Sequence, residues 1–399
     1  MQSSSKNSMS ERQSSLEDGL PSIAYSFNGY HGDYLSIPVA LAAVYHPRNV
    51  YCVLVDGSFT APEVDTLHRL ILEAVQKRHP DLSICDEADT VAACIVSRIF
   101  VHAGDFSVTW GGISEPLSTF DAMQKLVELD DHWSFFVNLT PLDYPLASQD
   151  DISELLKHEK GLTFMGTHAS SIDVAEGRFR DRWRQMHFDP SLIKKREDGK
   201  KEQRQKMLRL SSTLPDSISD SPLLRVYQSE AYGVFDRAFV LHALKSPLTH
   251  RVIALLSNGF ASSEQLLATI LGNSKEFGHC PSSLRMNNVA AGPDIDLKNP
   301  VDKEVQHSIE ALAESGLLFA RKFATVTCGN DSSDEYCQNA YNNELYRSSV
   351  WERLVKTPTS ESSSEKNNSQ LQEVWRTAAK ARFKSMEKSC YRPEKLAAN

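Results

Sequence analysis

The sequence lacks the short motifs that identify most nucleotide-binding and hydrolytic α/β enzymes. It contains no Gly-x-Gly-x-x-Gly, no Walker Gly-Lys-Ser/Thr and no Gly-x-Ser-x-Gly. The glycine-rich phosphate loops and the serine nucleophile elbow that these motifs encode are therefore absent. Dehydrogenase, P-loop and α/β-hydrolase functions lose most of their support.

The sequence also lacks a Cys-x-x-Cys pair, a long apolar run and a net positive charge. The seven cysteines include no Cys-x-x-Cys pair, which argues against a structural zinc site, although Cys328 and Cys337 are close enough in sequence to bridge a short loop. No run approaches the length of a membrane span, and the N-terminus lacks a signal-peptide core. The net charge of -9 gives no support to nucleic-acid binding, so no nucleic-acid partner is expected.

The composition is that of an ordinary globular protein, with 41% hydrophobic and 24% charged residues. Residues 1–20 are rich in Ser, Gln and Glu and are predicted to be disordered. We assign residues 21–340 to one catalytic domain with a surface insertion at 194–220, where a basic acceptor-binding flap is the alternative. Residues 341–399 form a C-terminal extension, in which a low-complexity linker at 357–370 precedes a terminal helix.

Strand and helix patterns alternate along the chain, which predicts an α/β fold. The expected strands are residues 22–27, 50–55, 135–139, 162–165, 225–227 and 231–235. The expected helices, where apolar residues recur at helical spacing, are residues 62–78, 117–127, 149–157, 237–244 and 371–386. We expect the last helix to pack Trp375 on the domain, with partner binding as the alternative. Asp56 follows a strand at its carboxyl end, where open α/β sheets bind nucleotides.

Five sequence blocks occur in the order typical of one enzyme family. They are Val-Tyr-His-Pro-Arg-Asn-Val-Tyr at residues 44–51, the strand-end Asp56, Trp-Gly-Gly-Ile-Ser at 110–114, Trp-Ser-Phe-Phe-Val-Asn-Leu at 133–139 and Asp-Tyr-Pro-Leu at 143–146. Over roughly residues 21–325, the chain thereby resembles the core-2/I-branching β-1,6-N-acetylglucosaminyltransferases and the peptide O-xylosyltransferases.

The resemblance implies a GT-A-like glycosyltransferase fold, in which a mixed, mainly parallel sheet is flanked by helices. It also implies inverting transfer of N-acetylglucosamine or xylose from a UDP-sugar to an acceptor hydroxyl on a glycan or protein. Members of the family are typically anchored in the Golgi by one N-terminal helix. Because no such helix is visible here, we expect that the chain either is missing its anchor or has lost it.

The candidate catalytic base is Glu264, in Ser-Ser-Glu-Gln-Leu-Leu-Ala-Thr-Ile. Inverting transfer needs a base to take the proton of the acceptor hydroxyl. The block is similar to the family's Ser-Pro-Asp-Glu-His-x-Trp-Ala-Thr, whose glutamate is that base. Spacing alone favours the alternative, a first-turn glutamate that complements the helix dipole, but the other matched blocks favour the base.

The resemblance further implies that basic side chains, rather than a metal ion, neutralise the diphosphate leaving group. No metal or other cofactor is therefore expected. The matching positions are Arg285 and Lys322, and Arg321 could assist. A solvated helix-end cation is the alternative for Lys322. The one literal Asp-x-Asp, at residues 294–296, follows Gly-Pro late in the chain and is interpreted as a loop.

Three further residues are assigned to the donor and acceptor cleft. Asp56 is the expected contact for the uridine, and its alternative is an aspartate that starts the turn at residues 57–58. Asp143 resembles the family's cleft aspartate, and its alternative is a turn residue before Pro145. Trp110 either forms a wall of the sugar pocket or lies in the core, and the core is favoured.

Three positions depart from the family pattern. Leu54 stands where a histidine is usual, and Ile-Pro at residues 37–38 interrupts a helix that usually carries arginines. Ala231 stands where the xylosyltransferases have an active-site aspartate. The donor sugar therefore stays open. A catalytically inactive binding protein of the same fold is the alternative function, and an unrelated α/β nucleotide-binding enzyme is a third.

Overall fold

The computed structural model describes most of the predicted domain and the C-terminal helix. The described residues are 19–30, 35–80, 96–105, 107–168, 185–193, 205–213, 224–286, 308–321, 323, 350–356 and 363–393. The predicted disordered segment before residue 19 and most of the predicted insertion at 194–220 lie outside them, as do Cys328 and Cys337. Among the described residues, no helix combines the length and the apolar character that crossing a membrane requires.

A seven-stranded sheet forms the centre of the protein, with the strand order β12-β7-β11-β5-β1-β2-β3. The strands are β1 (Ile23–Gly29), β2 (Val50–Val55), β3 (Ile99–Ala103), β5 (Phe135–Leu139), β7 (Leu162–His168), β11 (Gln228–Asp236) and β12 (Gly278–Cys280). Neighbouring strands pair in parallel except β11, which runs antiparallel to both β5 and β7. The predicted α/β class with a mixed, mainly parallel sheet is confirmed.

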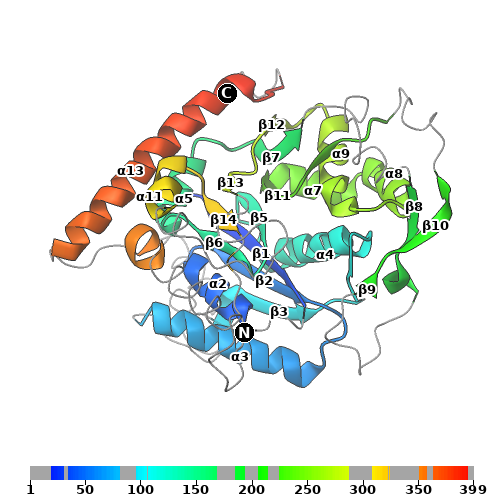
Figure 1. Ribbon diagram of the computed structural model, residues 1–399, viewed down its shortest axis with the longest axis horizontal. Coiled ribbons are helices and arrows are strands. Elements are labelled where there is room, and N and C mark those ends of the chain that lie inside the picture. The colour runs from blue at the N-terminus through cyan, green and yellow to red at the C-terminus, as the bar shows by residue number, and fades with distance from the viewer. Residues whose placement is uncertain are drawn as a thin grey trace, which may run out of the picture.

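Helices cover both faces of this sheet and enclose one hydrophobic core on each (Figure 1). One face carries α2 (Ser36–Val44), α3 (Ala61–Arg78), α5 (Gln149–Leu156), α11 (Ser308–Ser315) and α13 (Ser363–Met386). The other carries α4 (Ser114–Leu129), α7 (Arg237–Lys245), α8 (Pro247–Leu256) and α9 (Leu266–Asn273).

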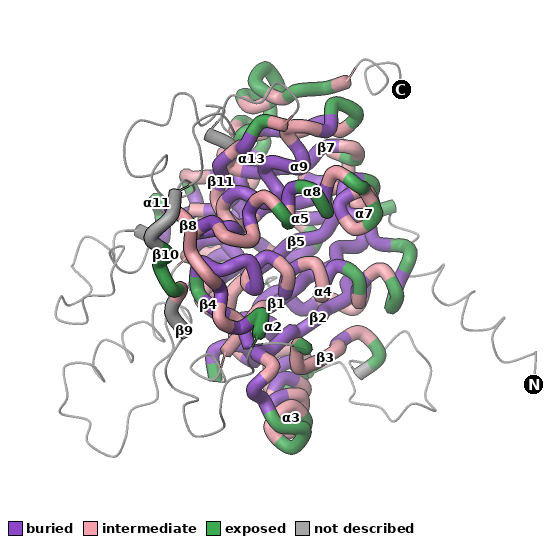
Figure 2. Tube along the Cα trace, turned by 90° about the vertical axis from the view of Figure 1, so that its right-hand side faces the viewer, coloured by how far each residue is buried: buried purple, intermediate pink, exposed green. Residues whose placement is uncertain are grey.

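Strand β1 shows why the central strands read as continuous apolar runs. Ile23, Tyr25 and Phe27 point into the first core and Ala24 into the second, because successive side chains alternate across a strand. A sheet that is covered on both faces needs apolar residues at both sets of positions. In Figure 2, β1, β2 and β5 are accordingly buried between the helices.

Helix starts follow local sequence signals, with one correction. Helix α3 begins with a capping box between Thr60 and Glu63, and Pro62 occupies its first turn. The prediction that Ile37–Pro38 interrupts a helix was wrong, because Pro38 lies in the first turn of α2. A proline is tolerated there, since the backbone N–H groups of the first turn have no partner within the helix.

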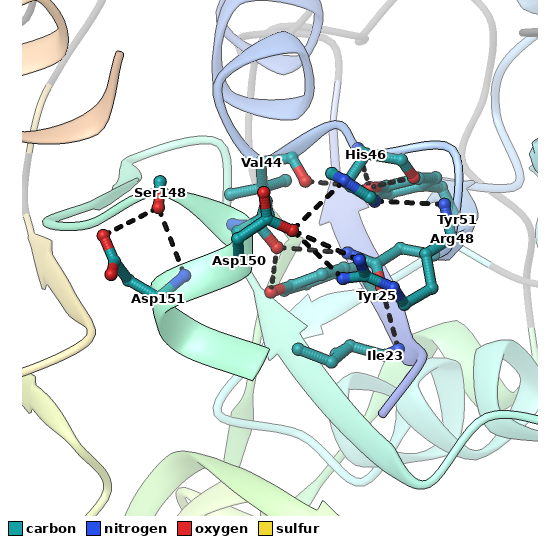
Figure 3. A network of polar contacts seen from close by, with 11 residues as sticks. Ile23, Tyr25, Val44, His46, Arg48, Tyr51, Ser148, Asp150 and Asp151 are labelled. Atoms are coloured by element: carbon teal, nitrogen blue, oxygen red, sulfur yellow. Dashed lines mark hydrogen bonds and ion pairs between the residues drawn. The ribbon is translucent and has the colours of Figure 1, made fainter. Parts of the chain in front are cut away.

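The Tyr-His-Pro-Arg-Asn block holds the amino ends of β1 and β2 together (Figure 3). The Asn49 side chain accepts a hydrogen bond from the Ile23 N–H (2.9 Å) and donates one to Gln149 (3.1 Å). The buried Tyr25 hydroxyl donates to the same Gln149 oxygen at 2.7 Å. Arg48 donates from both terminal nitrogens to Asp150, at 3.2 and 3.3 Å. This most family-like block is therefore structural.

Helix α13 belongs to the body of the fold. It begins at Ser363, eight residues before the predicted start, so part of the predicted linker at 357–370 is helical. Trp375 is buried, as predicted, and its indole N–H donates to the Leu317 carbonyl at 2.8 Å. A disulfide between Cys280 and Cys390, which was not predicted, ties the chain beyond α13 to β12.

Candidate functional site

A cavity of about 240 Å³ opens at the carboxyl ends of four parallel strands. Gly29 at the end of β1, Asp56 after β2, Gly104 after β3 and Leu139 at the end of β5 all line it. The chain proceeds outward from β1 to β2 and β3 and then returns to β5 on the other side of β1. The cavity therefore lies at a point where the strand order reverses, which is where open α/β sheets bind ligands.

Glu264 lies at the wall of this cavity that the start of α9 forms. It ends the 3₁₀ turn Ser262–Glu264, and its neighbours Ser263 and Leu267 line the cavity. The Glu264 carboxylate accepts a hydrogen bond from the Gln228 side chain at 3.1 Å. Because Gln228 begins β11, this bond fixes the carboxylate relative to the central sheet.

The turn before Glu264 is held by the Trp-Gly-Gly block. Ala261 adopts a left-handed backbone conformation with φ of 60°, which residues other than glycine rarely adopt. Its N–H donates to the Gly111 carbonyl at 2.8 Å, and the Gly111 N–H donates to the Glu115 carboxylate at 3.0 Å. Gly111 itself has φ of 78°, so its missing side chain permits this contact. Strain of this kind costs about 1–3 kcal/mol and is concentrated at functional sites.

A three-stranded sheet beside the cavity carries the charged residues. Its order is β13-β14-β6, with β6 (Asp143–Pro145), β13 (Arg285–Met286) and β14 (Phe319–Arg321). Arg321 pairs with Asp143 across the β14–β6 ladder, and Arg285 pairs with Phe319 across β13–β14. The sheet register therefore brings two arginines and an aspartate together.

Arg285 and Asp143 form a buried ion pair. The Arg285 Nε lies 3.1 Å from the Asp143 carboxylate, and neither side chain is more than 1% exposed. Arg285 also donates to the Asn138 carbonyl at 2.8 Å, while the second Asp143 oxygen accepts from the Thr140 N–H and hydroxyl. Burial lowers the pKa of Arg285, Asp143 raises it, and the positive charge of Arg321 lowers it further.

Arg321 lines the cavity and lies next to the Tyr232 ring. The guanidinium carbons of Arg321 and Arg285 each lie 4.4 Å from the centroid of that ring. Burial is the largest single influence on the pKa of Arg321 and lowers it. Tyr232 and Asp143 act in the opposite direction, and the pKa of Arg321 lies above its ordinary value. Arg321 of β14 therefore contributes a positive charge to the cavity lining, and Arg285 of β13 contacts the same tyrosine ring from outside the lining.

Comparison with known proteins agrees with this geometry. Residues 23–288 match the family model of the Core-2/I-Branching enzymes. The chain belongs to the Core-2/I-Branching enzyme family. Its sheet and helices form the GT-A-like fold that was predicted.

Two plant members and one human member of the Core-2/I-Branching family show the extent of the similarity. The beta-glucuronosyltransferases GlcAT14A and GlcAT14B of Arabidopsis thaliana are both 26% identical, over 76% and 75% of this chain and 61% and 62% of their own lengths. The beta-1,3-galactosyl-O-glycosyl-glycoprotein beta-1,6-N-acetylglucosaminyltransferase 3 of Homo sapiens is 25% identical over 58% of this chain and 43% of its own length. The chain thus spans about three fifths of the length of these plant relatives.

Asp56 has the contacts of a turn residue in this Core-2/I-Branching chain. One carboxylate oxygen accepts from the Ser58 N–H (3.0 Å) and hydroxyl (2.5 Å), and the other accepts from the Val108 N–H (2.7 Å). The carboxylate thereby joins the loops that follow β2 and β3. Asp56 also lines the cavity, and its contact with uridine stays a prediction.

Trp110 lies at the cavity and not in the core, so the favoured prediction for it was wrong. Its side chain is 56% exposed, and it packs edge-on against Phe260 with 5.3 Å between ring centroids.

The structure gathers most of the predicted site residues around one cavity. Asp56, Trp110 and Arg321 line it, and Glu264 lies between two lining residues. Arg285 and Asp143 lie behind the lining as a buried pair. Lys322 and residues 294–296 lie outside the described residues.

Sequence reasoning missed three residues that shape the site. Asn138 bridges β5 and β11, Tyr232 contacts both arginines, and Glu115 braces the Gly111 turn. Asn138 stands in the block at residues 133–139 that carries the family resemblance, and Tyr232 follows Ala231, which was noted as a departure from the family pattern. Their roles depend on a strand pairing between residues about ninety positions apart, which no local pattern reveals.

Proposed function

We propose that this chain is a metal-independent, inverting glycosyltransferase that moves a sugar from a UDP-sugar to a hydroxyl of a glycan or glycoprotein acceptor. The observation that carries the proposal is one cavity whose lining includes both Ser263, the residue before Glu264, and Arg321. A carboxylate can accept the acceptor proton, and guanidinium groups can stabilise the charge that develops on a diphosphate.

Each residue has a defined part in this reaction. The acceptor oxygen attacks the anomeric carbon, Glu264 takes the hydroxyl proton, and the bond from that carbon to the diphosphate oxygen breaks, so that UDP leaves and the anomeric configuration inverts. Arg321 faces the diphosphate from the cavity wall, and Lys322 is its sequence neighbour. Arg285, whose charge Asp143 balances, contacts the Tyr232 ring at 4.4 Å from its centroid and supports the arrangement from outside the lining.

Glucuronic acid is the donor sugar that we favour. The two plant relatives align over about three quarters of this chain and are named glucuronosyltransferases. The N-acetylglucosaminyltransferase aligns over 58% of it.

The donor assignment predicts a ranking that a panel of UDP-sugars can test. UDP-glucuronic acid should give the fastest UDP release, ahead of UDP-N-acetylglucosamine and UDP-xylose, measured with and without galactose-terminated acceptors. Fastest release from either of the other two donors would overturn the donor choice while leaving the reaction class intact.

A catalytically inactive binding protein is the second candidate function, because Leu54 and Ala231, two of the three departures from the family pattern, both line the cavity. It predicts that the protein binds UDP or a glycan yet turns over no donor in the panel. Failure to bind either UDP or a glycan would contradict both candidates.

Metal independence makes a separate prediction. Because arginines are proposed to neutralise the diphosphate, transfer should keep most of its rate in excess EDTA, measured as product formed per minute after the protein is dialysed against chelator. Complete loss of transfer on chelation, with recovery on adding manganese, would contradict the proposal. An EDTA-treated sample whose melting temperature is unchanged excludes unfolding as the cause of any loss.

A location in the Golgi lumen stays a prediction of the family resemblance. The Cys280–Cys390 disulfide supports it, because disulfides persist in oxidising compartments.

A further inference from the structure

Tyr232 occupies an unusual place, in contact with two cationic side chains. The guanidinium carbons of Arg285 and Arg321 both lie 4.4 Å from the centroid of its ring. Cations are attracted to the negative face of an aromatic ring within about 6 Å of its centroid. The two arginines influence each other's charge, as the effect of Arg321 on the pKa of Arg285 indicates.

Charge around the arginines explains why an aromatic ring suits this position. The Asp143 carboxylate pairs with Arg285 at 3.1 Å, and Glu230 also acts on both arginines. A further carboxylate would cancel positive charge and repel an incoming diphosphate. A tyrosine ring attracts both cations and adds no negative charge of its own, because burial raises the pKa of its hydroxyl further above the physiological range.

An irregularity in β11 places the ring at the cavity. The register of β11 against β7 shifts between Ser229 and Gly233, which is the position of a β-bulge. The Asn138 side chain donates to the Ala231 carbonyl (2.8 Å) and accepts from the Gly233 N–H (3.0 Å), so it satisfies the backbone groups at the shift. Tyr232 and its neighbour Ala231 consequently line the cavity.

The same asparagine connects the bulge to Arg285. The Asn138 carbonyl accepts a hydrogen bond from Arg285 at 2.8 Å. The Arg321 Nε, in contrast, is buried without a hydrogen-bond acceptor among the described residues. The Arg321 guanidinium contacts Tyr232 in two ways: it lies against the ring, and it lies within hydrogen-bonding reach of the Tyr232 hydroxyl.

We propose that Tyr232 is a positioning residue: its ring contacts both the buried Arg285 and Arg321, and it thereby holds the Arg321 guanidinium in the cavity lining, where Arg321 meets the diphosphate of the donor. The proposal rests on the proposed function, because it takes a nucleoside diphosphate as the ligand. Tyr232 acts through the arginines, so its removal affects the recognition of phosphate and not of the nucleoside.

Three variants separate the ring from the hydroxyl and from general effects. Tyr232→Leu removes the ring, and Tyr232→Phe keeps the ring but removes the hydroxyl. Tyr227→Leu is the matched control, since Tyr227 precedes the same strand and its ring lies against Gly272 of α9. UDP binding is measured by calorimetry, uridine binding by ligand-observed NMR, and donor KM and kcat by UDP release.

We expect Tyr232→Leu to weaken UDP binding and to raise the donor KM by about tenfold to thirtyfold, the size of two lost cation–π contacts. Uridine binding should stay within about twofold, because uridine carries no phosphate for the arginines to bind. Tyr232→Phe should restore UDP binding to within about threefold of wild type, and Tyr227→Leu should bind UDP as wild type does.

Other outcomes are equally informative. If Tyr232→Leu weakens UDP and uridine to the same degree, the ring merely shapes the cavity and the proposal is overturned. Unchanged UDP binding in Tyr232→Leu also overturns it, as does an equal loss in Tyr232→Phe. If wild type binds neither UDP nor uridine, the proposed function itself fails, and this result is distinct from the others.

Discussion

Glu264→Gln is expected to lower glycosyl transfer by about a hundredfold or more, which corresponds to about 3 kcal/mol of activation free energy. The substitution keeps the size of the side chain and its ability to accept the hydrogen bond from Gln228, but it removes the group that takes the acceptor proton. UDP affinity should stay within about twofold, because the base acts on the acceptor and not on the donor. Initial rates at saturating donor and calorimetric UDP binding provide the two measurements.

The chain offers a matched control for this substitution. Glu276 follows the carboxyl end of α9 and its side chain is 58% exposed, whereas Glu264 precedes the amino end of that helix. Glu276→Gln therefore removes the same charge at the opposite end of α9. It should transfer at the rate of wild type. A Glu264→Gln variant that is as active as Glu276→Gln would show that another group serves as the base.

Asp143→Ala is expected to lower the free energy of unfolding by about 3–5 kcal/mol, the usual cost of leaving one member of a buried ion pair without its partner. Arg285 would keep its charge in an environment where its side chain is only 1% exposed. The Thr140 N–H and hydroxyl would also lose their acceptor. The urea concentration at the midpoint of unfolding measures the change.

An exposed acid–arginine pair serves as the comparison. Glu73 pairs with Arg69 at 2.7 Å on α3, and their side chains are 55% and 62% exposed. Glu73→Ala should cost only about 0.2–0.5 kcal/mol, because solvent screens such a pair. Equal midpoints for the Asp143→Ala and Glu73→Ala variants would mean that the buried pair contributes nothing to stability.

The elements that sequence predicted well are those whose signal is local. The strands at 50–55 and 135–139 were predicted with their observed bounds. The helix predicted at 62–78 begins one residue earlier, at Ala61. Apolar runs and helical spacing report burial directly, and a capping box marks where a helix begins. Fold class followed from the order of these elements.

The failures concern contacts between distant residues. The predicted strand at 225–227 does not form, and β11 begins at Gln228, because Tyr227 and Arg225 bond to α9 side chains instead of a sheet neighbour. The same limit hides the bulge at Tyr232, since the Asn138 side chain that stabilises it comes from another strand. Trp110 was placed wrongly because an indole next to a glycine turn has no periodic pattern to show which way it points.

The Cys280–Cys390 disulfide has a topological consequence. With a sequence separation of 110 residues, it closes a covalent ring of chain that contains both Arg285 and Arg321. One cut in the backbone anywhere within that ring would leave a single covalent molecule. The Trp375 hydrogen bond to the Leu317 carbonyl would still hold the chain just before β14, which carries Arg321, against α13. The segment that carries Arg285 and Arg321 is therefore attached to the sheet in two ways, through the backbone at Cys280 and through the disulfide at Cys390.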